Sequence, residues 1–339
     1  MKRRTFLSLM GAAALTSSMM LTGCGAGSDD DRKIVRIGHV QSQTHPDHLG
    51  LEAFADHINE KLGDKYRVEV YPSELLGSQT EMVQLTQTGA IDFVVASNAI
   101  METFSAKYQI FNLPYLFSSV EAYHEAMDDP EVTDPIFKTT SKAGLETVAW
   151  LDAGTRNFYT IKTPINQPSD LKGLKIRVQD MKSQTDMMNY LGGIPVAMSY
   201  GDVYTSLQTG IIDGTENNET ALTTGKHGEV CKVYSVDQHA MIPDVLIMSE
   251  KVWKQISPED QEIILEAAHN STEAHKVMWD TAIEEAVKEA QETMGVEFVY
   301  DVDKEAFREA TQPMIEAYEE QYPGVKTLMD TIEAAREGE

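Results

Sequence analysis

Hydrophobic and polar positions follow two different periods in the first part of the chain. Residues 33–40 and 66–71 are rich in β-formers or alternate with period two, which predicts strands, and residues 91–96 are almost continuously apolar, which is typical of a buried parallel strand. Between these segments, 46–62 and 81–88 carry apolar residues at helical spacing. The order strand, helix, strand, helix, strand predicts a parallel sheet with right-handed crossovers.

A second series of elements begins near residue 147. The pattern predicts strands at 147–151, 158–161, 174–178, 196–198 and 211–213, and helices at 183–191 and 200–208. Residues 244–248 form a further apolar strand, which we expect to return to the first sheet. The chain is therefore predicted to be an α/β protein.

The clearest helical signal covers residues 258–294. Ser257 is a suitable N-cap, Pro258 suits the first helical position, and Gly295 ends the pattern. At 1.5 Å per residue such a helix is roughly 50 Å long, which exceeds the diameter of one small domain. Either it is a single rod that bridges two lobes, or it bends near residues 269–271.

The first 24 residues have the pattern of an export signal. Lys2, Arg3 and Arg4 precede an apolar stretch that is too short and wrongly flanked for a lasting membrane span. The segment Leu21-Thr22-Gly23-Cys24 resembles the bacterial lipoprotein processing box, in which Cys24 is diacylated; a plain signal peptide with an incidental cysteine is the alternative. The basic start suits either general or twin-arginine export. Residues 25–32 contain no large apolar residue and are expected to be a flexible tether.

Composition and charge exclude several classes of protein. The 339 residues include 54 acidic and 28 basic ones, a formal charge of −26, and loss of residues 1–24 removes three basic residues and makes it −29. Such a surface repels nucleic acids and anionic membranes. The 2 cysteines exclude a disulfide framework, and Cys231 is expected to be a small buried apolar residue.

No motif of an enzyme is present. The sequence lacks the Gly-x-Ser-x-Gly, His-Glu-x-x-His and Gly-x-x-x-x-Gly-Lys-Ser/Thr patterns. His45 and His48 could form a metal pair, but they are better interpreted as loop residues ahead of a helix, since no further ligand cluster is evident. We therefore expect neither catalysis nor a metal or other cofactor.

Several short motifs, in their order and spacing, resemble one family. They are Gly89-Ala90-Ile91-Asp92, Leu113-Pro114-Tyr115-Leu116-Phe117, Gly154-Thr155-Arg156-Asn157, Gly173-Leu174-Lys175-Ile176-Arg177-Val178 and Asp213-Gly214-Thr215-Glu216-Asn217. Over about residues 33–330 the chain resembles the DctP family, the solute-binding proteins of tripartite ATP-independent periplasmic (TRAP) transporters.

The resemblance implies a two-lobed, periplasmic-binding-protein-like α/β fold with a ligand cleft between the lobes and a long helix spanning both. Lobe I is expected at 33–153 and about 243–281, and lobe II at 154–242 and about 282–330. The ligand is expected to be an organic acid. The implied partners are the large and small membrane subunits of a permease that an ion gradient drives, and the implied location is the periplasm or the outer face of the cytoplasmic membrane.

The family's binding residues can be placed on individual positions. Arg177 falls on the central arginine, whose paired donors match a carboxylate. Arg156 matches a second arginine, which either binds the ligand or forms a structural ion pair. Asn217 matches a family asparagine, and Asn218 replaces the usual proline. Two adjacent amides suit hydroxyl groups, which favours a sugar acid, although Asn218 could instead stabilise its loop.

Further candidates share a position near the cleft, either at the end of a predicted strand or near the start of a helix. They are Tyr200, Ser97, Asn98, Gln79, Glu81, His39 and His48. The family resemblance, with Asn217 and Asn218 beside the two arginines, favours a hexuronate such as glucuronate or galacturonate. A C4-dicarboxylate or another carboxylate is the alternative within this class, and a sensor that presents its ligand to a receptor kinase is the alternative from another class.

Overall fold

The computed structural model of the chain describes residues 30–322, 326–327, 329–330 and 332. The predicted export signal, Cys24 and most of the predicted tether lie outside the described residues. From Arg32 onward the chain forms one compact unit. None of the described helices is both long and apolar enough to cross a membrane.

The first sheet has five strands in the order β2-β1-β3-β10-β4. They are β1 (Lys33–Gly38), β2 (Tyr66–Tyr71), β3 (Phe93–Ser97), β4 (Leu145–Leu151) and β10 (Asp244–Ser249). The pairs β1–β2 and β1–β3 are parallel, which confirms the prediction for the first three strands. The strand at 244–249 does return to this sheet, where it runs antiparallel to β3 and β4.

The connecting helices α1 (Pro46–Leu62) and α2 (Gln79–Thr88) begin and end at local signals in the sequence. The His45 side chain accepts a hydrogen bond from Asp47 N at the start of α1. At the start of α2, Ser78 and Glu81 form a capping box. Gly89 ends α2 in the left-handed conformation, which glycine adopts without strain.

The second sheet has six strands in the order β11-β9-β5-β8-β6-β7. They are β5 (Arg156–Thr160), β6 (Lys175–Val178), β7 (Ile194–Ala197), β8 (Gly214–Asn217), β9 (Val233–Ala240) and β11 (Glu297–Val299). The pairs β5–β8 and β5–β9 are antiparallel, whereas β6 is parallel to both β7 and β8. This sheet is therefore mixed, as is the first.

Shorter helices join the strands. They are α3 (Asn98–Met101), α4 (Val120–Asp128), α5 (Pro130–Phe137), α6 (Lys182–Tyr190), α7 (Val203–Gln208), α8 (Thr220–Thr223), α9 (Glu250–Trp253) and α11 (Lys304–Gln321). Five 3₁₀ turns occur in the described chain, at Ala106–Asn112, Lys138–Ala143, Pro168–Leu171, Tyr200–Asp202 and His227–Glu229. The predicted helix at 200–208 is thus a 3₁₀ turn followed by α7.

The strand predicted at 211–213 is wrong. The backbone N–H groups of Ile211 and Ile212 donate to Ser206 O and close the end of α7. The strand β8 begins only at Gly214, where a Cβ atom would lie 2.6 Å from the Tyr159 carbonyl oxygen. Close backbone approach at this glycine lets β8 pair with β5, a constraint that local hydrophobicity does not reveal.

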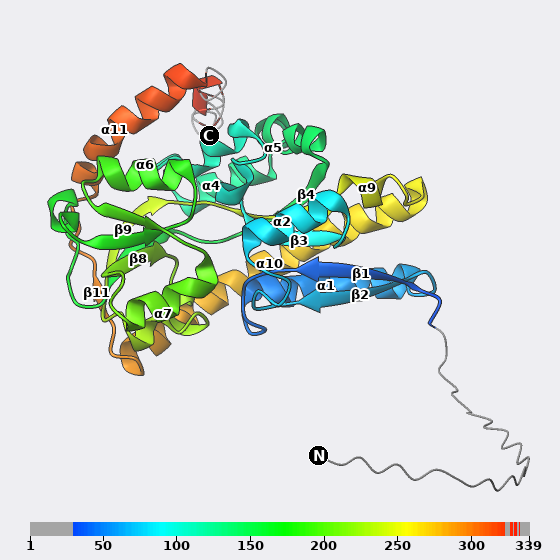
Figure 1. Cartoon of the computed structure of the whole chain (residues 1–339), viewed down its shortest axis with the longest axis horizontal. Coiled ribbons are helices and arrows are strands. Elements are labelled where there is room, and N and C mark those ends of the chain that lie inside the picture. The colour runs from blue at the N-terminus through cyan, green and yellow to red at the C-terminus, as the bar shows by residue number, and fades with distance from the viewer. Residues whose placement is uncertain (1–29, 323–325, 328, 331, 333–339) are drawn as a thin grey trace, which may run out of the picture. The chain divides into compact units, whose positions relative to one another are not determined.

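The long helix α10 (Pro258–Glu292) is a single element of 35 residues that remains helical through 269–271. Ser257 is its N-cap and accepts a hydrogen bond from Asp260 N. The helix packs against α1 and β4 near the first sheet and against α8 near the second, as its course in Figure 1 shows. The bridging rod is therefore the correct alternative.

The chain crosses between the two sheets at 152–155, at 241–243 and through α10. Gly154 at the first crossing has a φ of +63°. A Cβ atom at this position would lie 3.0 Å from the Trp279 ring of α10. The Asp152 carboxylate accepts a hydrogen bond of 2.7 Å from Gly154 N, so the turn is fixed both by its own bonds and by α10.

Gly154→Ala is expected to destabilise the protein more than Gly173→Ala. Both glycines have positive φ, but the space around Gly173 is empty whereas Gly154 touches Trp279. Positive-φ strain costs roughly 1 kcal/mol at either site, and overpacking adds about 1–3 kcal/mol at Gly154 alone. Urea unfolding of the two variants measures the difference. Equal losses would contradict the role assigned to the Trp279 contact.

Candidate functional site

A cavity of about 250 Å³ lies between the edges of the two sheets. This is slightly below the roughly 300–1,000 Å³ of pockets for drug-sized ligands, so the cavity suits a small molecule. From the first sheet and its connections, the polar lining residues include Gln41, Ser78, Gln79, Glu81, Ser97 and Asp244. From the second sheet they include Arg156, Arg177, Gln179, Asp180, Tyr200, Asn217 and Asn218.

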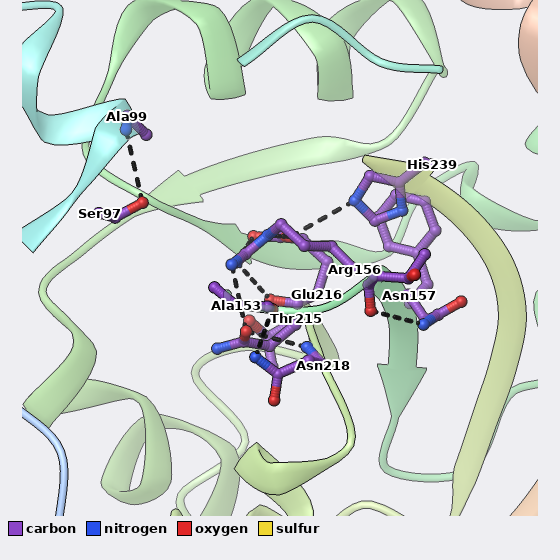
Figure 2. Close-up of polar contacts among 12 residues, drawn as sticks. Ser97, Ala99, Ala153, Arg156, Asn157, Thr215, Glu216, Asn218 and His239 are labelled. Atoms are coloured by element: carbon purple, nitrogen blue, oxygen red, sulfur yellow. Dashed lines mark hydrogen bonds and ion pairs between the residues drawn. The ribbon is translucent and has the colours of Figure 1, made fainter. Parts of the chain in front are cut away.

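A buried ion pair joins two neighbouring strands at the cavity wall. Arg156 at the start of β5 donates from Nε to Glu216 Oε2 at 2.5 Å and from Nη2 to Glu216 Oε1 at 2.9 Å. Arg156 Nη2 also donates to the Glu216 carbonyl oxygen at 3.1 Å. Figure 2 shows the two side chains together with His239. The two-point contact fixes the plane of the Arg156 guanidinium.

His239 and Asp237 extend this pair into a buried network. His239 Nε2 lies 3.4 Å from Glu216 Oε2, and its Nδ1 lies 2.7 Å from Asp237 Oδ2. Burial alone would lower the pKa of His239, but Asp237 and Glu216 raise it to about 9, so this histidine is a cation at neutral pH. Burial would raise the pKa of Glu216, whereas Arg156 and His239 lower it to about 2. The two cations and two anions of the network balance.

Arg177 on β6 has no such partner. Its Nε and Nη2 donate to the Met198 carbonyl oxygen at 3.1 and 2.8 Å, and it forms no ion pair with any carboxylate of the described residues. The side chain is 3% exposed. Burial lowers the pKa of Arg177; the negative charge of Glu216 opposes this shift, and the positive charge of Arg156 adds to it. The cavity therefore contains one uncompensated guanidinium, whose Nη1 remains to bind an anion.

The two adjacent amides have different tasks. Asn217 Oδ1 accepts from Arg156 Nη1 at 3.1 Å and from Asn218 N at 2.9 Å, which leaves the Asn217 amino group for the cavity. Asn218 Nδ2 donates to Ala153 O at 2.9 Å, and its Oδ1 accepts from Thr220 Oγ1 at 2.6 Å. Asn218 lines the cavity but also ties its loop to the crossing at 152–155.

Residues from the first sheet form a wall of hydrogen-bonding groups. Gln79 Oε1 accepts from Ser97 N at 3.2 Å, which sets the Gln79 side chain against the end of β3. Glu81 Oε2 accepts from Ser78 N at 2.8 Å within the capping box, and this bond lowers the pKa of Glu81. The Glu81 carboxylate therefore caps the start of α2 and also lines the cavity.

Asp244 also belongs to this wall, at the start of β10. Burial and the adjacent Asp47 raise the pKa of Asp244 well above its ordinary value, which favours the neutral carboxylic acid. Asp47 remains charged because it lies 2.9 Å from His275 Nε2 and 3.5 Å from His45 Nδ1. In its neutral form, Asp244 offers a carboxylic acid to the cavity and leaves the charge of Arg177 in place.

Tyr200 lines the second-sheet side of the cavity, in the 3₁₀ turn at 200–202. Its ring centroid lies 5.6 Å from that of His227. Burial raises the pKa of the Tyr200 hydroxyl to about 12, so the hydroxyl stays protonated and can donate. The ring supplies an apolar surface beside the charged groups.

Three of the predicted candidates do not line the cavity. Asn98 Nδ2 donates to Tyr108 O at 2.9 Å and to Asn112 Oδ1 at 2.8 Å, away from the cavity. His39 Nε2 and His48 Nδ1 bond to one another at 2.9 Å, and both rings are buried. The other eight candidate side chains, those of Arg177, Arg156, Asn217, Asn218, Tyr200, Ser97, Gln79 and Glu81, all line it.

Eight polar residues line the cavity without being among the predicted candidates: Gln41, Ser78, Thr80, Gln84, Gln179, Asp180, Ser199 and Asp244. Gln41, Gln179 and Asp180 follow β1 or β6 closely, and the rule that strand ends face the crevice could have found them. Asp244 has no such signal because it stands at the beginning of its strand. It reaches the cavity since β10 is antiparallel, with Asp244 beside Ser97 at the end of β3.

The chain is similar to known proteins over most of its length. A family model described as "Bacterial extracellular solute-binding protein, family 7", DctP, matches residues 37–321. An uncharacterised protein of Salmonella typhimurium, YiiZ, is 40% identical over 303 residues, which are 89% of this chain and 92% of that protein.

Two solved structures are similar over most of the chain. A TRAP periplasmic solute-binding protein of Anaerococcus prevotii with bound α/β-D-glucuronate is 50% identical, with a TM-score of 0.89 and coverage of 91% of this chain and 99% of that one. A TRAP periplasmic solute-binding protein of a Sulfitobacter species with bound β-D-galacturonate is 34% identical, with a TM-score of 0.84 and coverage of 88% and 98%. These structures support a two-lobed α/β fold, and this chain belongs to the DctP family of TRAP transporter solute-binding proteins.

Proposed function

We propose that this protein is an extracytoplasmic binding protein that captures a hexuronate, D-glucuronate or D-galacturonate, and delivers it to a TRAP permease in the membrane. The observation that carries the proposal is Arg177, which has no carboxylate partner among the described residues and lines a small cavity. Apart from the paired Arg156, the other polar side chains of this cavity are amides, hydroxyls and carboxyls. One ligand carboxylate neutralises this guanidinium. Sugar hydroxyls then match the remaining donors and acceptors.

The charges at the cavity favour a monocarboxylate over a dicarboxylate. Arg156 is already paired with Glu216, so a second ligand carboxylate has no second available cation. On the remaining wall it would approach the exposed carboxylates Glu81 and Asp180. Like charges repel, and hydroxyl groups can instead donate to these oxygens. The relatives with bound glucuronate and galacturonate support the same choice.

We assign the ligand contacts to the eight lining candidates and to Asp244, with Arg177 on the carboxylate. We assign lobe I to residues 33–153 and about 243–281, and lobe II to 154–242 and about 282–330. The first sheet lies in lobe I and the second in lobe II under this assignment. The crossings at 152–155 and 241–243 are then the hinge about which the lobes close on the ligand.

Calorimetry with a panel of acids tests the ligand class. D-glucuronate and D-galacturonate are expected to bind, whereas succinate, malate and fumarate are expected to bind at least 100-fold more weakly, or about 2.7 kcal/mol. Aldonates and a sialate complete the panel. Tight binding of the C4-dicarboxylates alone would refute the hexuronate proposal.

Arg177→Met is expected to weaken hexuronate binding by roughly 30-fold or more, because truncating one partner of a buried charge pair costs about 2–5 kcal/mol. The variant should remain folded, since the Arg177 side chain donates only to the Met198 carbonyl oxygen among the described residues. Arg308→Met is the matched control, because Arg308 is exposed on α11, away from the cavity. Binding by a folded Arg177→Met protein that equals the control would contradict the role of Arg177.

We also propose that Cys24 is lipidated after export and anchors the protein at the outer face of the cytoplasmic membrane. The pattern of residues 1–24 supports this proposal. The wild-type protein is then expected in the membrane fraction, and Cys24→Ser in the soluble extracytoplasmic fraction. Cys231→Ala is the control, since Cys231 is buried. A wild-type protein without a lipid by mass spectrometry would contradict the anchor.

A further inference from the structure

Two carboxylates reach from the connections of the first sheet to the second. Glu74, in the loop between β2 and α2, accepts a hydrogen bond of 3.0 Å from Gly201 N. Gly201 lies in the 3₁₀ turn at 200–202, which follows β7. This turn has no hydrogen bond from a side chain of its own N-cap residue, Ser199. The contact therefore joins segments that belong to different sheets.

The backbone around Glu74 is held in an unfavourable conformation. Ser73 and Glu74 have φ values of 55° and 59°, in the left-handed region that residues other than glycine rarely adopt. Hydrogen bonds from Ser73 N to Gln41 O at 2.9 Å and from Glu74 N to His39 O at 3.2 Å maintain it. Such strain persists only where the surroundings impose it and is concentrated at functional sites. Here it directs the Glu74 carboxylate to Gly201.

A second contact has the same form. Glu102 Oε1, just after α3, accepts a hydrogen bond of 3.2 Å from Ser183 N in the first turn of α6. The N-cap residue of α6, Met181, provides no side-chain hydrogen bond. Asn112 Nδ2 donates to Glu102 Oε2 at 3.1 Å and to Ser183 Oγ at 3.2 Å. The buried Asn98 donates in turn to Asn112 Oδ1 and so supports the residue that bonds to Glu102.

Both contacts lie next to the cavity. Gly201 directly follows Tyr200, which lines the cavity. Ser183 lies a few residues after Gln179 and Asp180, which also line it. Glu74 and Glu102 themselves are not among the lining residues. The carboxylates come from the first-sheet side and the backbone donors from the second. Both bonds are formed in the present conformation, and separation of the sheets at these points would break them.

We propose that Glu74 and Glu102 are positioning residues that latch the closed cleft and slow ligand release without touching the ligand. The inference rests on the proposed closure of two lobes. Because the bonds form only when the segments meet, their loss should raise koff and leave kon nearly unchanged. The ordinary net contribution of one hydrogen bond corresponds to an increase in koff of about 3- to 10-fold for each variant and about 10-fold or more for both.

The test measures koff and kon by stopped-flow fluorescence, with the tightest-binding acid of the panel, for Glu74→Ala, Glu102→Ala and the double variant. Glu125→Ala, an exposed substitution on α4, is the matched control. Faster release with unchanged kon is the expected result. Release rates equal to those of the control would overturn the proposal.

A double-mutant cycle separates a latch from a general loss of structure. A Cβ atom at Gly201 would lie 2.2 Å from Glu74 Oε2, and the φ of Gly201 is not positive. Gly201→Ala is therefore expected to speed release in the wild type, where it displaces Glu74, and to have no further effect in Glu74→Ala. Independent, additive effects would contradict a direct contact.

Amide hydrogen exchange tests the two contacts of Glu74 and Glu102 without a ligand. If no acid of the panel binds, the proposed function fails, and the latch is then read from the exchange rates of the Gly201 and Ser183 amides in the ligand-free protein. In the double variant, the amide hydrogens of Gly201 and Ser183 should both exchange faster than they do in Glu125→Ala. Unchanged exchange at both amides would overturn the latch as well.

Discussion

The ion pair between Arg156 and Glu216 is the interaction on which the binding site depends. It joins β5 to β8 deep in the second sheet, and His239 and Asp237 complete its charge balance. A buried charge without a partner would be costly, so this network holds its strands in one register. Its functional consequence is indirect. Because the Arg156 guanidinium is paired with Glu216, Arg177 is the cation at the cavity that a ligand must neutralise.

The position of the cavity follows from strand direction. The ends of β1 and β3 and the start of the antiparallel β10 meet on one side, and residues that follow β6 and β7 meet on the other. Two short crossings and α10 connect the sides. In the proposed closure, few chain segments restrain the movement of one sheet relative to the other, and contacts at the rim of the cavity are then expected to affect how long a ligand stays.

Local signals in the sequence were sufficient for much of the fold. The helix at Pro46–Leu62 and the start of α10 agree with their prediction because caps, proline and apolar spacing act within a few residues. The strand at 211–213 failed because Ser206 O takes the backbone donors of two of its residues. The binding role of Arg177 could be predicted from a sequence motif. The ion pair of Arg156 with Glu216 and the position of Asp244 at the cavity could not, because both depend on residues far away in the sequence.

The structure of the protein with bound D-glucuronate tests the central claim most directly. We predict that the ligand carboxylate lies at Arg177 while Arg156 stays paired with Glu216. The ring hydroxyls are expected at Asn217 and at the wall formed by Gln79 and Asp244. A carboxylate bound away from Arg177, or an Arg156 that leaves Glu216 to hold the ligand, would contradict this claim.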